Sequence, residues 1–180
     1  MKQFIIICIS LFFVAACKSS FRYKTVNFED KYSLTIPAIL TETDDINDDA
    51  SMQFKNEFIE FYVLVFDESK DEINDFFMKV NLPEYYDMGL ENYSNLIWES
   101  LNNNFEIYNY TDFFDVDING LPAKYVEFKG KFSDIDIYYS LTVIEGEKNF
   151  YQISSWTLTS MESRNKEKID EIKFTFKELN

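Results

Sequence analysis

Two acidic segments carry the residue spacing that comes nearest to a metal site. The run Asp115-Val116-Asp117-Ile118-Asn119-Gly120 matches the first half of an EF-hand loop, where Asp, Asp, Asn and a turn glycine surround calcium. The second half does not match, because the twelfth position must supply a bidentate glutamate and is Val126. The alternation of apolar and acidic residues instead predicts a strand that ends in an Asn-Gly hairpin turn.

The second acidic segment, residues 44–49, has the highest density of carboxylates in the chain. Asp45, Asn47 and Asp49 stand at alternate positions, as calcium ligands do, but the position that requires glutamate is Asn56. We therefore expect an acidic surface loop without a resident cofactor. Asp45, Asn47 and Asp49 remain weak candidates for a low-affinity divalent cation site.

The composition excludes the common catalytic groups. The chain has no histidine, which removes the commonest general base, the commonest zinc ligand and the imidazole-dependent triads. Its 32 Asp and Glu residues make paired carboxylates such as Glu57 and Glu60 unavoidable by chance. We expect a protein that is not an enzyme.

The first residues predict an export signal that ends at a cysteine. Lys2 is followed by an apolar core and then by Val14-Ala15-Ala16-Cys17, which resembles the lipobox of a bacterial lipoprotein. The 15 uncharged residues from Gln3 to Cys17 are fewer than the roughly 20 that a spanning helix needs. We expect cleavage before Cys17 and a lipid on its thiol, with an ordinary secretory signal as the alternative.

This signal sets the expected domain organisation and location. Residues 1–16 are removed, residues 17–21 carry the lipid and form a short tether, and residues 22–180 form one domain. Signals that retain a lipoprotein in the inner membrane typically have an aspartate-like residue directly after the cysteine. Here that residue is Lys18, which favours the outer membrane, with the domain facing the periplasm. The mature chain keeps 16 Lys and Arg against 32 Asp and Glu, or −16, because Lys2 is lost. Such a charge argues against nucleic acid and anionic lipid as direct partners of the domain.

Hydrophobic periodicity predicts strands, two helices, a run of antiparallel strands and a closing helix. The first helix should start at the capping box Ser69-Lys70-Asp71-Glu72 and place Ile73, Phe76, Phe77 and Val80 against a sheet. The capping box Thr159-Ser160-Met161-Glu162 should open the last helix, which buries Ile169 and Ile172. The fold class is α+β, an antiparallel sheet with helices packed on its faces. The expected strands are 21–28, 32–36, 52–54, 58–66, 105–110, 113–118, 123–128, 135–144 and 150–158, and the second helix is 90–102.

Several short motifs resemble the PsbP-like fold family. They are Tyr32-Ser33-Leu34-Thr35-Ile36-Pro37, Ile118-Asn119-Gly120-Leu121-Pro122-Ala123, the hairpin around Glu145-Gly146-Glu147, and a final Ile169-Asp170-Glu171-Ile172 helix before Phe174-Thr175-Phe176. The resemblance implies an α/β/α sandwich and a place among bacterial lipoproteins such as the DcrB-like proteins. It implies binding or scaffolding and transfers no site residue.

The expected function is therefore that of a non-enzymatic envelope lipoprotein. The membrane is its first partner, through the lipid on Cys17, and an envelope protein is its second. The alternative is a ligand-binding domain that uses a pocket between helix and sheet or the acidic loop. An aromatic groove for sugar or peptide could be lined by Trp98 and Trp156 with Tyr85, Tyr86, Tyr138, Tyr139 and Tyr151. The positions of Trp98 beside a helix stripe and of Trp156 within a strand favour core packing instead.

Overall fold

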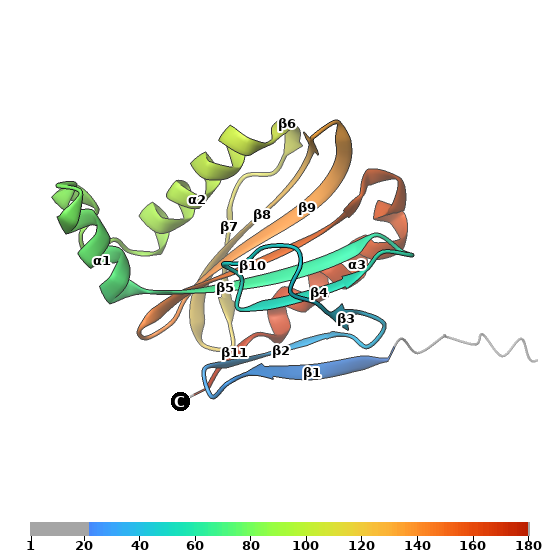
Figure 1. The fold of residues 1–180 in the computed structure, drawn as a ribbon, viewed down its shortest axis with the longest axis horizontal. Helices are drawn as coiled ribbons and strands as arrows, with labels where there is room; N and C mark the ends of the chain where they lie inside the picture. Colours follow the sequence, from blue (N-terminus) through green and yellow to red (C-terminus); the bar gives the residue numbers. More distant parts are fainter. Residues whose placement is uncertain (1–21, 180) are drawn as a thin grey trace, which may run out of the picture.

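A computed structural model describes residues 22–179 (Figure 1). The predicted signal peptide, Cys17 and the 17–21 tether lie outside these residues. The helices are α1 (Lys70–Lys79), α2 (Leu90–Asn104) and α3 (Glu162–Ile172), with short 3-10 helices η1 (Pro83–Tyr85), η2 (Thr159–Met161) and η3 (Lys173–Thr175). The strands are β1 (Tyr23–Phe28), β2 (Tyr32–Pro37), β3 (Thr41–Glu42), β4 (Met52–Asn56), β5 (Phe61–Ser69), β6 (Glu106–Tyr110), β7 (Phe114–Ile118), β8 (Leu121–Phe132), β9 (Ile135–Glu145), β10 (Asn149–Leu158) and β11 (Lys177–Glu178).

An eight-stranded antiparallel sheet forms the centre of the fold. Its order is β3-β4-β5-β10-β9-β8-β6, and β7 also pairs with β8. The turn between β7 and β8 is the predicted Asn-Gly hairpin, because Asn119 and Gly120 both adopt positive φ, at 54° and 91°. Ile118 is buried while Asp117 is exposed, so the predicted alternation is confirmed. The α+β fold class with an antiparallel sheet is confirmed as well.

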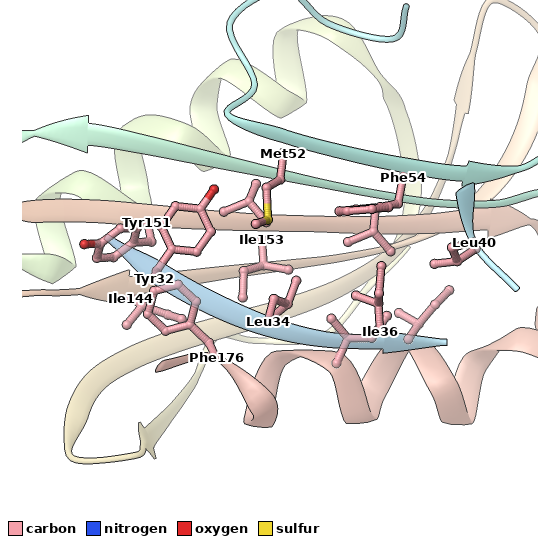
Figure 2. Packing of buried hydrophobic residues seen from close by; sticks show 14 of the residues in the cluster. Tyr32, Leu34, Ile36, Leu40, Met52, Phe54, Ile144, Tyr151, Ile153 and Phe176 are labelled. Carbon is pink, nitrogen blue, oxygen red and sulfur yellow. The ribbon is translucent and has the colours of Figure 1, made fainter. Parts of the chain in front are cut away.

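One face of this sheet is covered by a second sheet together with α3. The second sheet has the order β1-β2-β11, so the first two predicted strands do not join the main sheet. Tyr32, Leu34 and Ile36 of β2 are fully buried against the main sheet and Phe176 (Figure 2). The periodicity gave no sign of β11, because a strand of two residues has no repeat to read; it forms by pairing with Ser33 and Tyr32.

The other face carries α2, while α1 differs from the prediction. In Figure 1, α1 projects beyond the end of the sheet and is not laid across it. Ser69 caps the helix as predicted, since its Oγ accepts a hydrogen bond from the Glu72 amide at 3.4 Å. Of the expected apolar stripe, Phe77 is buried, but Phe76 and Val80 are 58% and 46% exposed. The apolar stripe of a helix is buried only where another apolar surface packs against it, and here such a surface covers only part of the stripe.

Two predicted boundaries are wrong. The strand expected from Phe58 begins at Phe61, and residues 57–60 form a turn that leaves Phe58 97% exposed. Thr159-Ser160-Met161 forms a 3-10 turn, so α3 starts at Glu162 without a side-chain cap. Ile169 and Ile172 are buried as predicted. Within the described residues, each helix is too short or too polar to cross a bilayer.

Candidate functional site

A row of four aromatic rings crosses the face of the main sheet that carries α2. Strand register places Tyr62 of β5, Trp156 of β10, Tyr139 of β9 and Phe128 of β8 directly opposite one another. The Tyr62 and Trp156 rings stack at 5.1 Å and 8°, and the Trp156 and Tyr139 rings at 5.8 Å and 9°. The Tyr139 and Phe128 rings continue the stack at 4.8 Å. We call these four residues the aromatic row.

Helix α2 covers only one end of the aromatic row. Trp98 of α2 meets the Phe128 ring edge-on at 5.7 Å. Tyr93, near the start of the helix, stacks on Phe150 at 4.2 Å and donates a hydrogen bond to Glu68 at 2.7 Å. These contacts hold α2 over β8 and β9, so the Tyr62 and Trp156 end of the row is only partly covered.

The acidic loop between β3 and β4 forms the opposite wall. The buried side chain of Gln53 holds this loop, since its Oε1 accepts hydrogen bonds from the amides of Ile46 and Asn47 at 3.0 Å each. Its Nε2 donates to the Asn47 carbonyl at 2.6 Å. One buried amide therefore fixes the loop that brings Asn47 and Asp49 beside the sheet.

Floor and walls enclose a groove with a volume of about 610 Å³. This volume lies in the range of small-molecule sites in proteins. The groove is mainly apolar, with carboxylates of Asp49, Glu60 and Glu68 at its rim. Its lining residues, all within the described chain, include no lysine or arginine. A second hollow of about 550 Å³ between α1 and α2 shares Glu68, Ile97 and Ser100 with it.

Burial raises the pKa values of two tyrosines in the groove, in one case together with a hydrogen bond. The Tyr62 hydroxyl donates to Glu60 at 2.8 Å, and burial together with this bond raises the pKa of Tyr62 to about 12. Burial raises the pKa of Tyr139 to about 12 as well. Gln152 donates to the Tyr93 hydroxyl at 3.0 Å, deep in the groove. At neutral pH these phenols are uncharged, so the carboxylates set the sign of the local charge.

The predicted metal candidates are not brought together as a ligand set. The Asp45 carboxylate accepts from Thr43 at 2.6 Å and pairs with Lys55 at 2.8 Å, and these hydrogen bonds hold its pKa below the usual range. Asn47 Oδ1 accepts from the Asp49 amide. Asp115 pairs with Lys124 at 2.7 Å. Residues 22–179 contain no group of three or more Asp, Glu, His or Cys side chains arranged to bind a metal ion.

A second polar cluster lies on the opposite face of the sheet, under α3. Glu127 of β8 accepts from Lys166 at 2.5 Å and pairs with Lys173 at 3.5 Å. Lys173 is 3% exposed, and its ammonium lies 4.0 Å from the centre of the Tyr125 ring. Burial lowers the pKa of Lys173. Helix α3 covers this cluster, so the cluster ties the helix to the sheet. Lys166 and Asp170 of α3 also line an open hollow of about 510 Å³.

The sequence analysis named Trp156 and Tyr139 as possible groove residues, and both line it. It named Glu60 only as one of many chance carboxylate pairs and missed Tyr62, Glu68 and Gln152. Trp98 packs beside the groove against Phe128 and does not line it. The sequence of β10 did contain a sign of the groove. On the side of the strand that faces α2, the polar Gln152 and Ser154 stand between apolar residues. Tyr62 could not be identified, because its place depends on pairing with a strand about 90 residues away.

No protein-family model matches this chain, and no curated protein matches it in sequence. Solved structures match its fold. CyanoP, the cyanobacterial PsbP of Synechocystis sp. PCC 6803, superposes with a TM-score of 0.55 at 11% identity, over 92% of this chain and 98% of that one. LpqN of Mycobacterium tuberculosis, described as involved in cell envelope biogenesis, gives 0.57 at 7% identity, over 89% and 92%.

A protein of unknown function from Pseudomonas aeruginosa, PA94, gives a TM-score of 0.50 at 10% identity, over 83% of this chain and 92% of that one. Matches at such low identity report on the fold alone. The expected PsbP-like fold is confirmed by these three structures together.

Proposed function

We propose that this chain is a non-enzymatic binding module of a bacterial envelope, anchored through lipid on Cys17. Its domain faces the periplasm from the outer membrane, and the groove beside α2 binds a neutral or cationic amphipathic molecule. The observation that carries the proposal is the groove itself, an apolar hollow of about 610 Å³ with a ring-lined floor. An envelope role is supported by the likeness to LpqN, whose described role is in envelope biogenesis.

The shape of the groove favours a ligand with an apolar body. The rings of the aromatic row stand nearly parallel to one another and cover each other's faces, so they offer edges and side-chain carbon to an occupant. Ile97, Leu101 and Leu158, which are partly exposed, add aliphatic surface to the same lining. Apolar surface removed from water is worth about 25 cal/mol per Å², which makes burial the main source of affinity.

The charge of the groove selects among such ligands. Asp49, Glu60 and Glu68 stand at the rim with no cation among the lining residues of the described chain. An anionic head group would meet uncompensated like charges in a partly desolvated site, whereas a cationic one would pair with them. The groove therefore favours neutral and cationic amphiphiles over anionic ones of the same size.

Three probes with the same apolar tail test this proposal. Dodecyltrimethylammonium, dodecyl maltoside and dodecyl sulfate are titrated below micelle-forming concentrations into the mature chain with Trp98→Phe, so that Trp156 is its single fluorescent tryptophan. We expect the ammonium and the maltoside to change Trp156 emission at lower concentration than the sulfate. Equal responses to all three head groups, or no response to any of them, would contradict the assignment.

Charge variants locate the selectivity. Glu60→Gln and Glu68→Gln together should weaken the preference for the ammonium over the sulfate by about tenfold, which is one unit of log affinity. Glu84→Gln and Glu147→Gln together remove the same two charges from exposed positions and serve as the matched control, since neither residue lines the groove. A loss of the same size in this control would show that net charge alone produces the preference.

Anchoring is tested separately from the groove. Expressed in a bacterium with its own signal, the chain should lose residues 1–16 and gain the mass of lipid at Cys17, and Cys17→Ser should move it from membranes to the soluble fraction. Fractionation of inner and outer membranes checks the location. A mature chain without added acyl mass would refute the anchor and leave the groove assignment intact.

A further inference from the structure

We propose that the turn between β4 and β5, Asn56–Glu60, docks onto the bilayer surface, with Phe58 inserted at the lipid head groups. The proposal rests on the lipid anchor at Cys17. Docking of this turn would give the anchored domain a defined orientation on the membrane. The proposed occupant is a lipid surface, and a protein contact at the same turn is an outcome that the experiment below distinguishes.

The fold forces Phe58 into solvent. Its side chain is 97% exposed, whereas its neighbour Ile59 is buried in the closed core. The Ile59 carbonyl accepts a buried hydrogen bond from the Asn165 side chain at 2.8 Å. Because Ile59 is held on the inside of the turn, the preceding side chain points outward. Its exposure therefore follows from the fold.

Asn56 joins this turn to the place where the described chain begins. Its Oδ1 accepts from the Phe58 amide at 3.1 Å, and its Nδ2 donates to the Ile39 carbonyl at 2.9 Å. Ile39 is itself 44% exposed, and the adjacent Ala38 amide donates to the Arg22 carbonyl at 2.8 Å. These contacts bring the β4–β5 turn and the start of β1 to one end of the molecule, on the right in Figure 1.

The length of chain before Arg22 keeps this end close to the lipid. Cys17 precedes Arg22 by five residues, and at 3.3–3.6 Å each these reach at most about 18 Å. An end of the domain tethered so closely meets the membrane surface whenever the protein is anchored. An exposed phenyl ring at that end can exchange water for the head-group region, where aromatic side chains are favoured.

Part of the charge around the turn is already paired, which lowers the barrier to approaching lipid. Lys55 bridges Glu57 and Asp45, with both distances at 2.8 Å. Glu60 accepts from the Tyr62 hydroxyl, and the Lys24 ammonium donates to the Leu40 carbonyl at 2.8 Å. The Lys24 ammonium is thus turned toward protein, so apolar contact is the main term and zwitterionic lipid suffices.

Docking in this way also orients the second hollow, the one between α1 and α2. Strand β5 runs from the Phe58 turn to α1 over nine residues, or about 30 Å. The hollow between α1 and α2 therefore lies at the end of the sheet away from the bilayer. An occupant reaches it from the periplasmic side.

A single introduced thiol tests the orientation. In the mature lipidated protein Cys8 is removed and Cys17 carries lipid, so Phe58→Cys provides the single free thiol for an environment-sensitive fluorophore. Phe76→Cys is the matched control, because Phe76 is also an exposed phenylalanine and its helix, α1, lies at the opposite end of the molecule (Figure 1). Both proteins are reconstituted in phosphatidylcholine vesicles. Nitroxide lipids and a water-soluble nickel chelate serve as the two quenchers.

The label at position 58 should be quenched mainly by nitroxide lipid, at a depth of about 5–10 Å, and the label at 76 mainly by the nickel chelate. Equal access of both labels to the chelate in a protein of lipidated mass would overturn the docking and leave the anchor standing. A label at 58 shielded from both quenchers would assign the turn to a protein contact and also overturn it. A mature mass without lipid would remove the anchor, and the orientation with it.

Discussion

The two faces of the main sheet are covered in different ways. On the closed face, β2 and α3 bury Tyr32, Leu34, Phe61 and Phe176 until no surface remains. On the groove face, α2 covers β8 and β9 and leaves Trp156 and Leu158 only partly buried. The same sheet thus has one face that serves stability and one with space for a ligand.

The two faces also treat charge differently. Under α3, Glu127 is matched by the buried Lys173 and by Lys166, so each charge has a partner. In the groove, Asp49, Glu60 and Glu68 face an apolar hollow with no lysine or arginine among its described lining residues. Paired buried charges fix an element in place, whereas unmatched carboxylates beside a cavity select what enters it.

The strongest test of this contrast is one substitution made on each face. Leu34→Ala leaves a cavity in the closed core and should lower the free energy of unfolding by about 3 kcal/mol. Leu158→Ala on the groove face should cost about 1 kcal/mol, because water already reaches that side chain. Urea denaturation of both variants gives the two values. Equal losses would mean that the faces are packed alike.

A second test removes the carboxylate under α3. Glu127→Gln removes one of the two carboxylates, with Asp170, that pair with both Lys166 and Lys173, and should lower the free energy of unfolding by about 2 kcal/mol. Asp115→Asn is the control, since its ion pair with Lys124 is exposed and should change stability by less than about 0.5 kcal/mol. Similar melting temperatures for both variants would argue against a structural role for the cluster.

A third test uses alkaline titration of the groove. The pKa of Tyr62 is raised by burial and by its bond to Glu60, so the phenol stabilises the fold below pH 10, and this contribution is lost between pH 10 and about 12. Glu60→Gln removes the bond and should lower the pKa of Tyr62 toward 10, as followed by carbon-13 NMR of labelled tyrosine. The pKa of Tyr139 is raised by burial and not by Glu60, so it should stay the same in this variant. A fall in the pKa of both tyrosines would mean that the substitution loosens the packing of the whole groove.

The smallest effect is expected on α1. Phe76→Ala should change the free energy of unfolding by less than about 0.5 kcal/mol, because the ring is exposed. Phe77→Ala on the same turn should cost about 2 kcal/mol, since Phe77 packs into the groove-face cluster. Thermal melts of both variants compare the two losses of unfolding free energy. A costly Phe76→Ala would mean that α1 lies against the domain in solution, which would cover the second hollow.

Local patterns predicted much of the fold. The Asn119-Gly120 hairpin and the Ser69 cap follow from residues a few positions apart, and both are confirmed. The β9–β10 hairpin was also expected. If residues 145–148 formed its turn, residue 144 would pair with residue 149 and Trp156 would lie opposite Ile137. The observed register pairs Trp156 with Tyr139, which completes the aromatic row. A shift of two residues keeps every side chain on its face and changes which rings stack.

The sequence by itself determined the α+β class, the positions of most strands and helices and the absence of histidine chemistry, and it predicts the lipid anchor at Cys17. These follow from residue type and short-range periodicity. Only the tertiary structure decided that β1 and β2 form a separate sheet, that α1 projects from the domain and that α2 leaves a groove. These depend on which distant surfaces bury each other. Burial is non-directional, so no local pattern encodes the choice of partner.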